Sequence, residues 1–99
     1  MRITSSGNVG IGTTTPVWKL QVAAVGAPQF ILSDTGAGAN LKHWAFTSQA
    51  GNLYISTSTD AYATSTTPAL SILSGGNYNI GRIAVGTSTS YAKFTVWGD

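Results

Sequence analysis

The sequence predicts an all-β fold, and three observations lead to this prediction. Charged residues make up only 8% of the 99 residues, so the polar surface must come from Ser, Thr, Asn and Gly. These four residue types disfavour helices, because the first three compete for backbone hydrogen bonds and glycine costs conformational entropy. Short apolar segments separated by Gly- and Asn-containing turns then indicate a small sandwich or a compact meander of short strands.

An internal repeat divides the chain. Residues 7–22 match residues 81–96 without a gap, at a constant offset of 74. Val9 corresponds to Ile83 and Ile11 to Val85, while Gly, Thr, Lys and Val recur at six positions. We therefore expect a connector over residues 1–22, a central β-module over 23–76, and a second, degenerate connector over 77–99.

Each connector has the pattern of a strand, a turn and a second strand. Val9 and Ile11 lie on one face of the first strand, and glycines occupy the other face. A face without side chains is typical of close approach by another backbone. A threefold shaft, in which three chains wind about one axis, would supply that backbone. In the alternative, the glycines form a glycine-rich turn on the surface of a monomer.

The central module contains four expected strands, over residues 29–33, 41–47, 53–57 and 69–72. In the second of these, Trp44 and Phe46 alternate with polar or small residues, as in a half-buried strand. Gln49-Ala-Gly-Asn52 predicts a hairpin turn between the second and third strands. The segments 34–40 and 58–67 are expected to be loops.

Two segments carry a resemblance to a known family. Ser5-Ser-Gly-Asn-Val-Gly-Ile-Gly-Thr-Thr-Thr-Pro16, followed by Lys19-Leu-Gln-Val22, resembles the SGNVGIGTTSP…KLxV signature of phage tail-fibre and tailspike stalk proteins, which also occurs in repetitive bacterial surface proteins. In the second copy Ala84 and Ser90 replace Gly10 and Pro16. The resemblance implies a β-rich, parallel homotrimer in an extended extracellular fibre, on a virion or a bacterial cell surface.

Composition argues against several partners. The net charge of +2 is dispersed, without a basic run that could neutralise successive phosphates, so we expect no nucleic acid. No apolar stretch reaches the roughly 18 residues that a membrane-spanning helix needs, so we expect no membrane insertion.

Few residues could support catalysis or metal binding. Asp34 and Asp60 are the internal acids, and each is expected to be a turn residue whose carboxylate accepts backbone N–H groups. His43 is the only histidine, and we expect a half-buried strand residue rather than a metal ligand. We therefore expect no enzyme, no metal and no cofactor.

The aromatic residues are the remaining binding candidates. Trp44 and Tyr54 are expected to pack in the core, whereas Tyr62 and Tyr78 stand among polar residues and are expected to be exposed. The sequence therefore predicts a structural spacer of a trimeric fibre whose partner is itself, with end-to-end assembly of the trimers as a further option. The alternative is a carbohydrate- or receptor-binding module that contacts a cell-surface glycan through Tyr62 and Tyr78.

Overall fold

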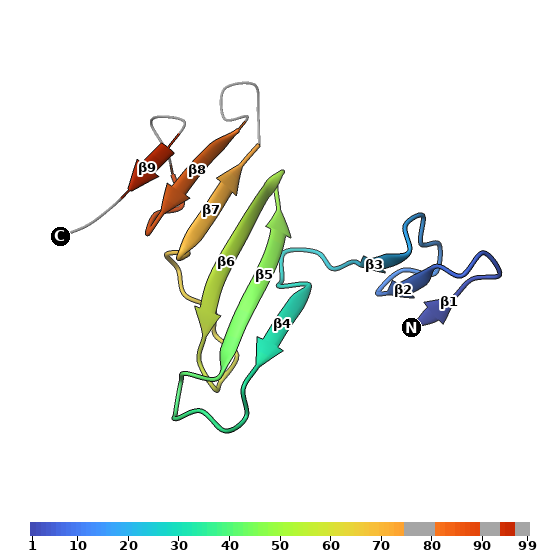
Figure 1. The fold of residues 1–99 in the computed structure, drawn as a ribbon, viewed down its shortest axis with the longest axis horizontal. Coiled ribbons are helices and arrows are strands. Elements are labelled where there is room, and N and C mark those ends of the chain that lie inside the picture. Colours follow the sequence, from blue (N-terminus) through green and yellow to red (C-terminus); the bar gives the residue numbers. More distant parts are fainter. Residues whose placement is uncertain (75–80, 90–93, 97–99) are drawn as a thin grey trace.

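The computed structural model describes residues 1–74, 81–89 and 94–96, and over these residues the chain forms strands, turns and loops without a helix (Figure 1). The all-β prediction is confirmed. The strands form a three-stranded sheet of order β1-β2-β3 and a six-stranded sheet of order β4-β5-β6-β7-β8-β9. Their bounds are β1 Arg2–Ile3, β2 Val9–Ile11, β3 Leu20–Val22, β4 Phe30–Ser33, β5 His43–Gln49, β6 Asn52–Ser58, β7 Leu70–Leu73, β8 Arg82–Val85 and β9 Phe94–Val96.

The six-stranded sheet is a meander from β4 to β8. Each of these strands pairs antiparallel with the next, and β9 is added parallel to β8. The predicted hairpin joins β5 to β6, with Gln49 opposite Asn52. Its two turn residues, Ala50 and Gly51, have φ angles of 52° and 82°, as a type I′ turn requires.

The internal repeat is visible in the strand pairing. Val9 pairs with Leu20 in the first copy, and Ile83 pairs with Phe94 in the second, at the same offset of 74 residues. In both copies the two strands are parallel. The neighbouring strand also corresponds, because β1 pairs antiparallel with β2 as β7 pairs with β8. The three-stranded sheet is therefore a second version of β7-β8-β9, and the C-terminal connector belongs to the same sheet as the central module.

The close approach expected at the connector glycines occurs within one chain. A Cβ atom on Gly10 would lie 2.5 Å from the carbonyl oxygen of Thr13 and 3.1 Å from the Cγ atom of Pro16. Both residues belong to the loop that crosses from β2 to β3. Interpreting Gly10 as the contact site of a neighbouring backbone is therefore wrong, because the chain's own crossover loop fills that space.

The molecule is thin and has almost no core of its own. Its smallest extent is 17 Å, and its radius of gyration is 15.6 Å, against about 12.6 Å for a compact chain of this length. It exposes 6856 Å², whereas a compact protein of this mass exposes roughly 5,300 Å². Among the described residues other than proline, the buried apolar side chains are those of Ala45, Leu73 and Ala84. No second layer faces the six-stranded sheet over the part of the chain that the structure describes.

Candidate functional site

One face of the six-stranded sheet is almost entirely apolar. Directly paired residues point to the same side of an antiparallel sheet, so the register defines rows of side chains across the strands. One row contains a single apolar residue from each of β4 to β8: Phe30, Phe46, Ile55, Leu70 and Val85. A neighbouring row contains Leu53, Ile72 and Ile83, and a third contains Leu32 and Trp44. We call these ten residues the apolar face.

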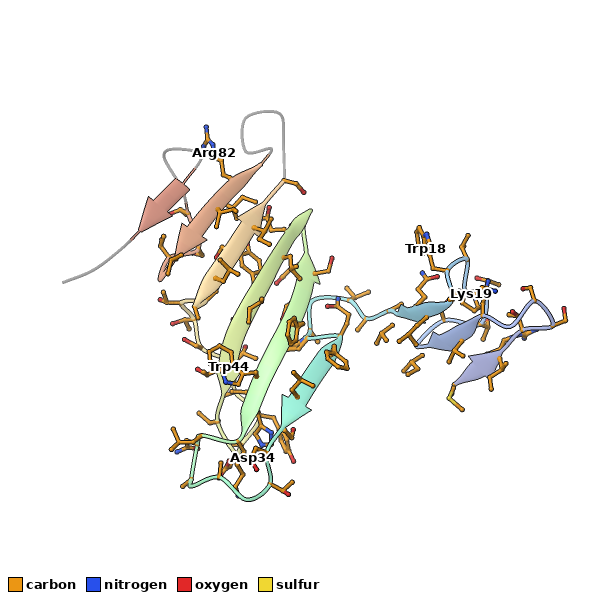
Figure 2. The ribbon with its side chains drawn as sticks, in the orientation of Figure 1. Trp18, Lys19, Asp34, Trp44 and Arg82 are labelled. Atoms are coloured by element: carbon orange, nitrogen blue, oxygen red, sulfur yellow. The ribbon has the colours of Figure 1, made fainter. Side chains whose placement is uncertain are left out.

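The apolar face is open to solvent in the single chain. Seven of its side chains, including that of Trp44, are between 37% and 54% exposed, although large apolar residues of this kind normally fill a core (Figure 2). The polar positions in the same rows are Ser48 and Thr57, and none of the described residues in these rows is charged. Continuous apolar surfaces of this kind are typical of sites that contact another protein, a membrane or a ligand.

The three-stranded sheet repeats this arrangement on a smaller scale. Ile3, Ile11 and Leu20 are exposed, and by register they correspond to Ile72, Val85 and Phe94. In the second connector, Ile83 and Val85 are likewise exposed. These corresponding residues lie on two separate sheets, which the linker over residues 23–29 joins (Figure 1).

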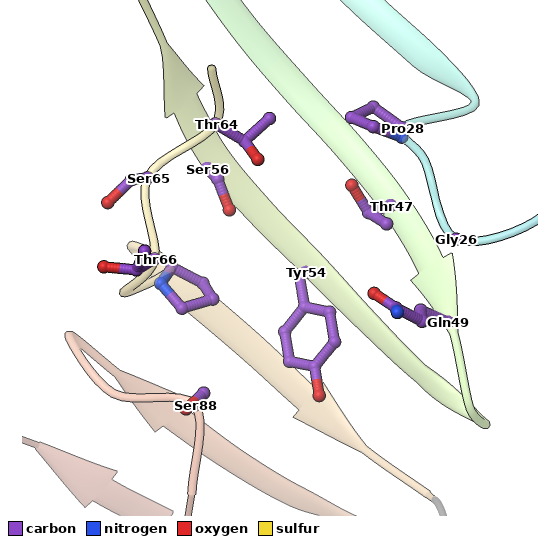
Figure 3. Close-up of a pocket in the computed structure, with 11 residues that line it drawn as sticks. Gly26, Pro28, Thr47, Gln49, Tyr54, Ser56, Thr64, Ser65, Thr66 and Ser88 are labelled. Atoms are coloured by element: carbon purple, nitrogen blue, oxygen red, sulfur yellow. The ribbon is translucent and has the colours of Figure 1, made fainter.

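The opposite face of the six-stranded sheet is polar and partly covered by loops. Ser71 is fully buried there, and its hydroxyl donates to the carbonyl oxygen of Thr87 at 2.8 Å. Tyr54 pairs with Thr47 on this same face, where it lines a hollow with Ser56 (Figure 3). Grouping Tyr54 with Trp44 as packing residues of one core is therefore wrong, because the two side chains lie on opposite faces of the sheet.

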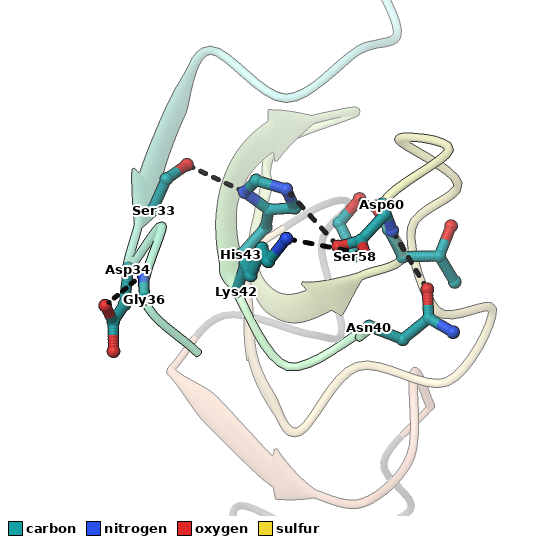
Figure 4. A network of polar contacts seen from close by, with 9 residues as sticks. Ser33, Asp34, Gly36, Asn40, Lys42, His43, Ser58 and Asp60 are labelled. Atoms are coloured by element: carbon teal, nitrogen blue, oxygen red, sulfur yellow. Dashed lines mark hydrogen bonds and ion pairs between the residues drawn. The ribbon is translucent and has the colours of Figure 1, made fainter. Parts of the chain in front are cut away.

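A polar network joins the loops at one end of this sheet (Figure 4). The hydroxyl of Ser33 and Nδ1 of His43 share a hydrogen bond of 2.7 Å. The Asp60 carboxylate lies 3.8 Å from Nε2 of His43 and 3.8 Å from the Lys42 ammonium, and the backbone N–H of Asp60 donates to Asn40 at 3.0 Å. A separation of 3.8 Å exceeds a hydrogen bond, so the carboxylate does not orient the imidazole as a catalytic triad requires.

Within the described part of the chain, the acidic and aromatic residues that the sequence singled out do not form one common site. Asp34 forms the expected turn, because its carboxylate accepts the backbone N–H of Gly36 at 3.0 Å. Asp60 instead faces Lys42 and His43. Tyr62 is 73% exposed, has a φ of 63°, and places its ring 5.5 Å from that of His43. Tyr78 lies outside the described residues.

The remaining features of the chain concern metal binding, membrane spanning and similarity to known proteins. Across the residues that the structure describes, no cluster of three His, Asp or Glu side chains is close enough to hold a metal ion. The described segments also include no helix with the length and apolarity to cross a bilayer. No family model matches the chain, and no curated protein is significantly similar to it in sequence.

Proposed function

We propose that this chain is a structural module of an extracellular fibre, in which the apolar faces of three parallel copies pack against one another. The observation that carries the proposal is the uncovered apolar face of the six-stranded sheet. Burying apolar area contributes about 25 cal/mol per Å², and the described part of the chain, which buries little more than Ala45, Leu73 and Ala84, gains little of this energy alone. Association with further copies supplies the missing core.

A second copy is the occupant that best fits this surface. The apolar face has no described charged residue, so a complementary partner surface must itself be apolar and uncharged. The chain presents such a surface on both of its sheets. Its low net charge of +2 also leaves little repulsion between identical copies at close range.

The number three and the fibre context come from the resemblance of the connectors to tail-fibre stalk proteins. The repeated pairing of the two connectors supports this organisation, because an extended fibre is built from units that present the same face repeatedly along an axis. The proposed mechanism is mechanical: stiffness arises from burying strand faces between copies. It requires no catalytic residue, metal or cofactor.

Fluorescence of Trp44 tests the proposal directly. A variant with Trp18→Phe and Trp97→Phe retains Trp44 as its only tryptophan. Because Trp44 lies on the apolar face, association should bury it. Its fluorescence emission should therefore be blue-shifted and resistant to acrylamide quenching at micromolar protein concentration, and dilution should reverse both properties. The matched control retains Trp18 alone, which lies in the β2–β3 crossover and off the apolar face (Figure 2). Trp44 that is quenched as freely at high concentration as after dilution would contradict the proposal.

A further inference from the structure

A hollow of about 190 Å³ lies on the polar face of the six-stranded sheet, opposite the apolar face. Its floor is made by β5 and β6, through Thr47, Tyr54 and Ser56 (Figure 3). Its wall includes the loop residues Thr64–Thr66. Every residue that lines it is uncharged, and most carry a hydroxyl group. The hollow therefore offers hydrogen bonds without a formal charge.

Two residues in the floor are nearly buried, and their hydroxyl groups have no hydrogen-bond partner among the described residues. Thr47 is 9% exposed and Ser56 is 5% exposed, yet neither hydroxyl makes a hydrogen bond to another described residue. No fully enclosed polar atom of the described residues lacks a partner, so both hydroxyls retain contact with the open hollow. The buried Ser58 on the same strand differs, because its hydroxyl donates to the carbonyl oxygen of Thr59. Both hydroxyls are therefore accessible and available to a ligand.

Tyr54 adds an aromatic surface beside these hydroxyls. The ring is half-buried, and its hydroxyl accepts a hydrogen bond of 2.9 Å from the amide of Asn52. This bond holds the ring in place next to Gln49 and the floor residues (Figure 3). A fixed aromatic ring beside uncharged hydrogen-bonding groups suits a pyranose, whose C–H face packs on the ring while its hydroxyls bind the surrounding oxygens.

We propose that this hollow binds a neutral sugar residue, with Tyr54 as the packing surface and the Thr47 and Ser56 hydroxyls as hydrogen-bonding groups. The site goes beyond the spacer role and does not depend on it, because described residues of one chain form the hollow. It also faces away from the apolar face. Covering the apolar face with other copies therefore leaves the hollow open to a glycan.

Titration with the methyl pyranosides of glucose, galactose and mannose tests this site, read out by amide chemical shifts of the ¹⁵N-labelled protein. We expect at least one of them to give saturable shifts at Thr47, Tyr54, Ser56 and Thr64–Thr66, with a Kd on the order of millimolar, as is typical of a small ligand. Methyl glucuronide is the charged comparison and should bind more weakly. The absence of saturable shifts with all three neutral sugars would overturn the proposal.

Variants assign the binding to the hollow. Ser56→Ala removes one hydroxyl and should weaken binding about tenfold, while Ser58→Ala, on the same face of the same strand, should leave it unchanged. Thr66→Trp fills the rim from an exposed loop position and should abolish binding without disturbing the sheet. Binding that survives Thr66→Trp, or that is lost in Tyr62→Ala instead, would overturn the assignment. The oligomeric mass of each variant, measured alongside, separates failure of this site from failure of the proposed assembly.

Discussion

Phe46 on β5 and Ile55 on β6 lie directly opposite each other, in the middle of a sheet face that the described chain leaves uncovered. On the other side of the same two strands, Ala45 and Ser56 form the adjacent pair and are both buried. The small and polar residues are thus covered by the chain's own loops, and the large apolar residues are not. This inversion of the usual core is the feature that any account of the protein's function must explain.

A charge on the apolar face should break the assembly. Ile72 is 38% exposed and lies between Leu53 and Ile83. Ile72→Lys would place an unpaired ammonium between copies, at a cost of roughly 2–5 kcal/mol for each buried charge. Sedimentation velocity should therefore report a shift from the assembled species to the monomer.

Thr35→Lys is the matched control, since it adds the same charge in the exposed loop between β4 and β5. It should leave the sedimentation profile unchanged. An Ile72→Lys protein that sediments like the wild type would show that the apolar face is not an interface.

Gly10→Ala should destabilise the three-stranded sheet of each chain. The added Cβ atom would meet the Thr13 carbonyl oxygen at 2.5 Å, and such overpacking typically costs about 1–3 kcal/mol. Hydrogen exchange of the β1, β2 and β3 amides should be faster in this variant.

Gly38→Ala provides the comparison, because its added Cβ atom would lie 3.7 Å from the Cδ1 atom of Leu41, which is an ordinary van der Waals distance. Its exchange rates should match those of the wild type. Equal protection in the two variants would mean that the crossover loop does not pack on Gly10.

Ala50→Asn should stabilise the β5–β6 hairpin. Ala50 has a φ of 52°, a left-handed conformation that alanine adopts at a cost and that asparagine tolerates well. We expect a gain of roughly 0.5–1 kcal/mol in the free energy of unfolding, measured with urea. Ala39→Asn, at an exposed loop position without a positive φ, should change this free energy by less than about 0.5 kcal/mol. A gain of similar size at both positions would point to a general effect of asparagine rather than to the turn.

The sequence was most informative about local structure. Alternation around Trp44 and Phe46 predicted a strand with one apolar face, and Gln49-Ala-Gly-Asn52 predicted the hairpin. Both follow from short-range rules, because side chains alternate along a strand and turns need particular residues. The 74-residue offset likewise predicted that the two connectors would have the same form, and their strand pairings match.

Features that depend on non-local contacts were harder to predict. Alternation carries no information about strand direction, so the parallel pairing of β2 with β3 was not foreseen. The backbone that packs against Gly10 could not be identified either. A glycine indicates only that another backbone comes close, and not whether that backbone belongs to the same chain or to a second copy. The Ser33–His43–Asp60 network went unnoticed because it depends on the register of β4 with β5, which pairs Ser33 with His43, and on the path of the loop that brings Asp60 to them.

The position of Tyr54 could have been predicted. Leu53 and Ile55 flank it, and if both point to the apolar face, the residue between them must point to the other. Its aromatic character favoured a packing role, but the alternation placed it on the polar face beside Thr47. The hollow itself depends on the loop over residues 59–68, whose path the sequence does not reveal.

Sedimentation equilibrium at micromolar concentration tests the central claim most directly. If the apolar faces of three copies shelter one another, the measured mass should be three times the 10.2 kDa of a single chain. A well-folded species of 10.2 kDa that persists at this concentration would contradict the account, because the exposed apolar face would then be stable in water without a partner.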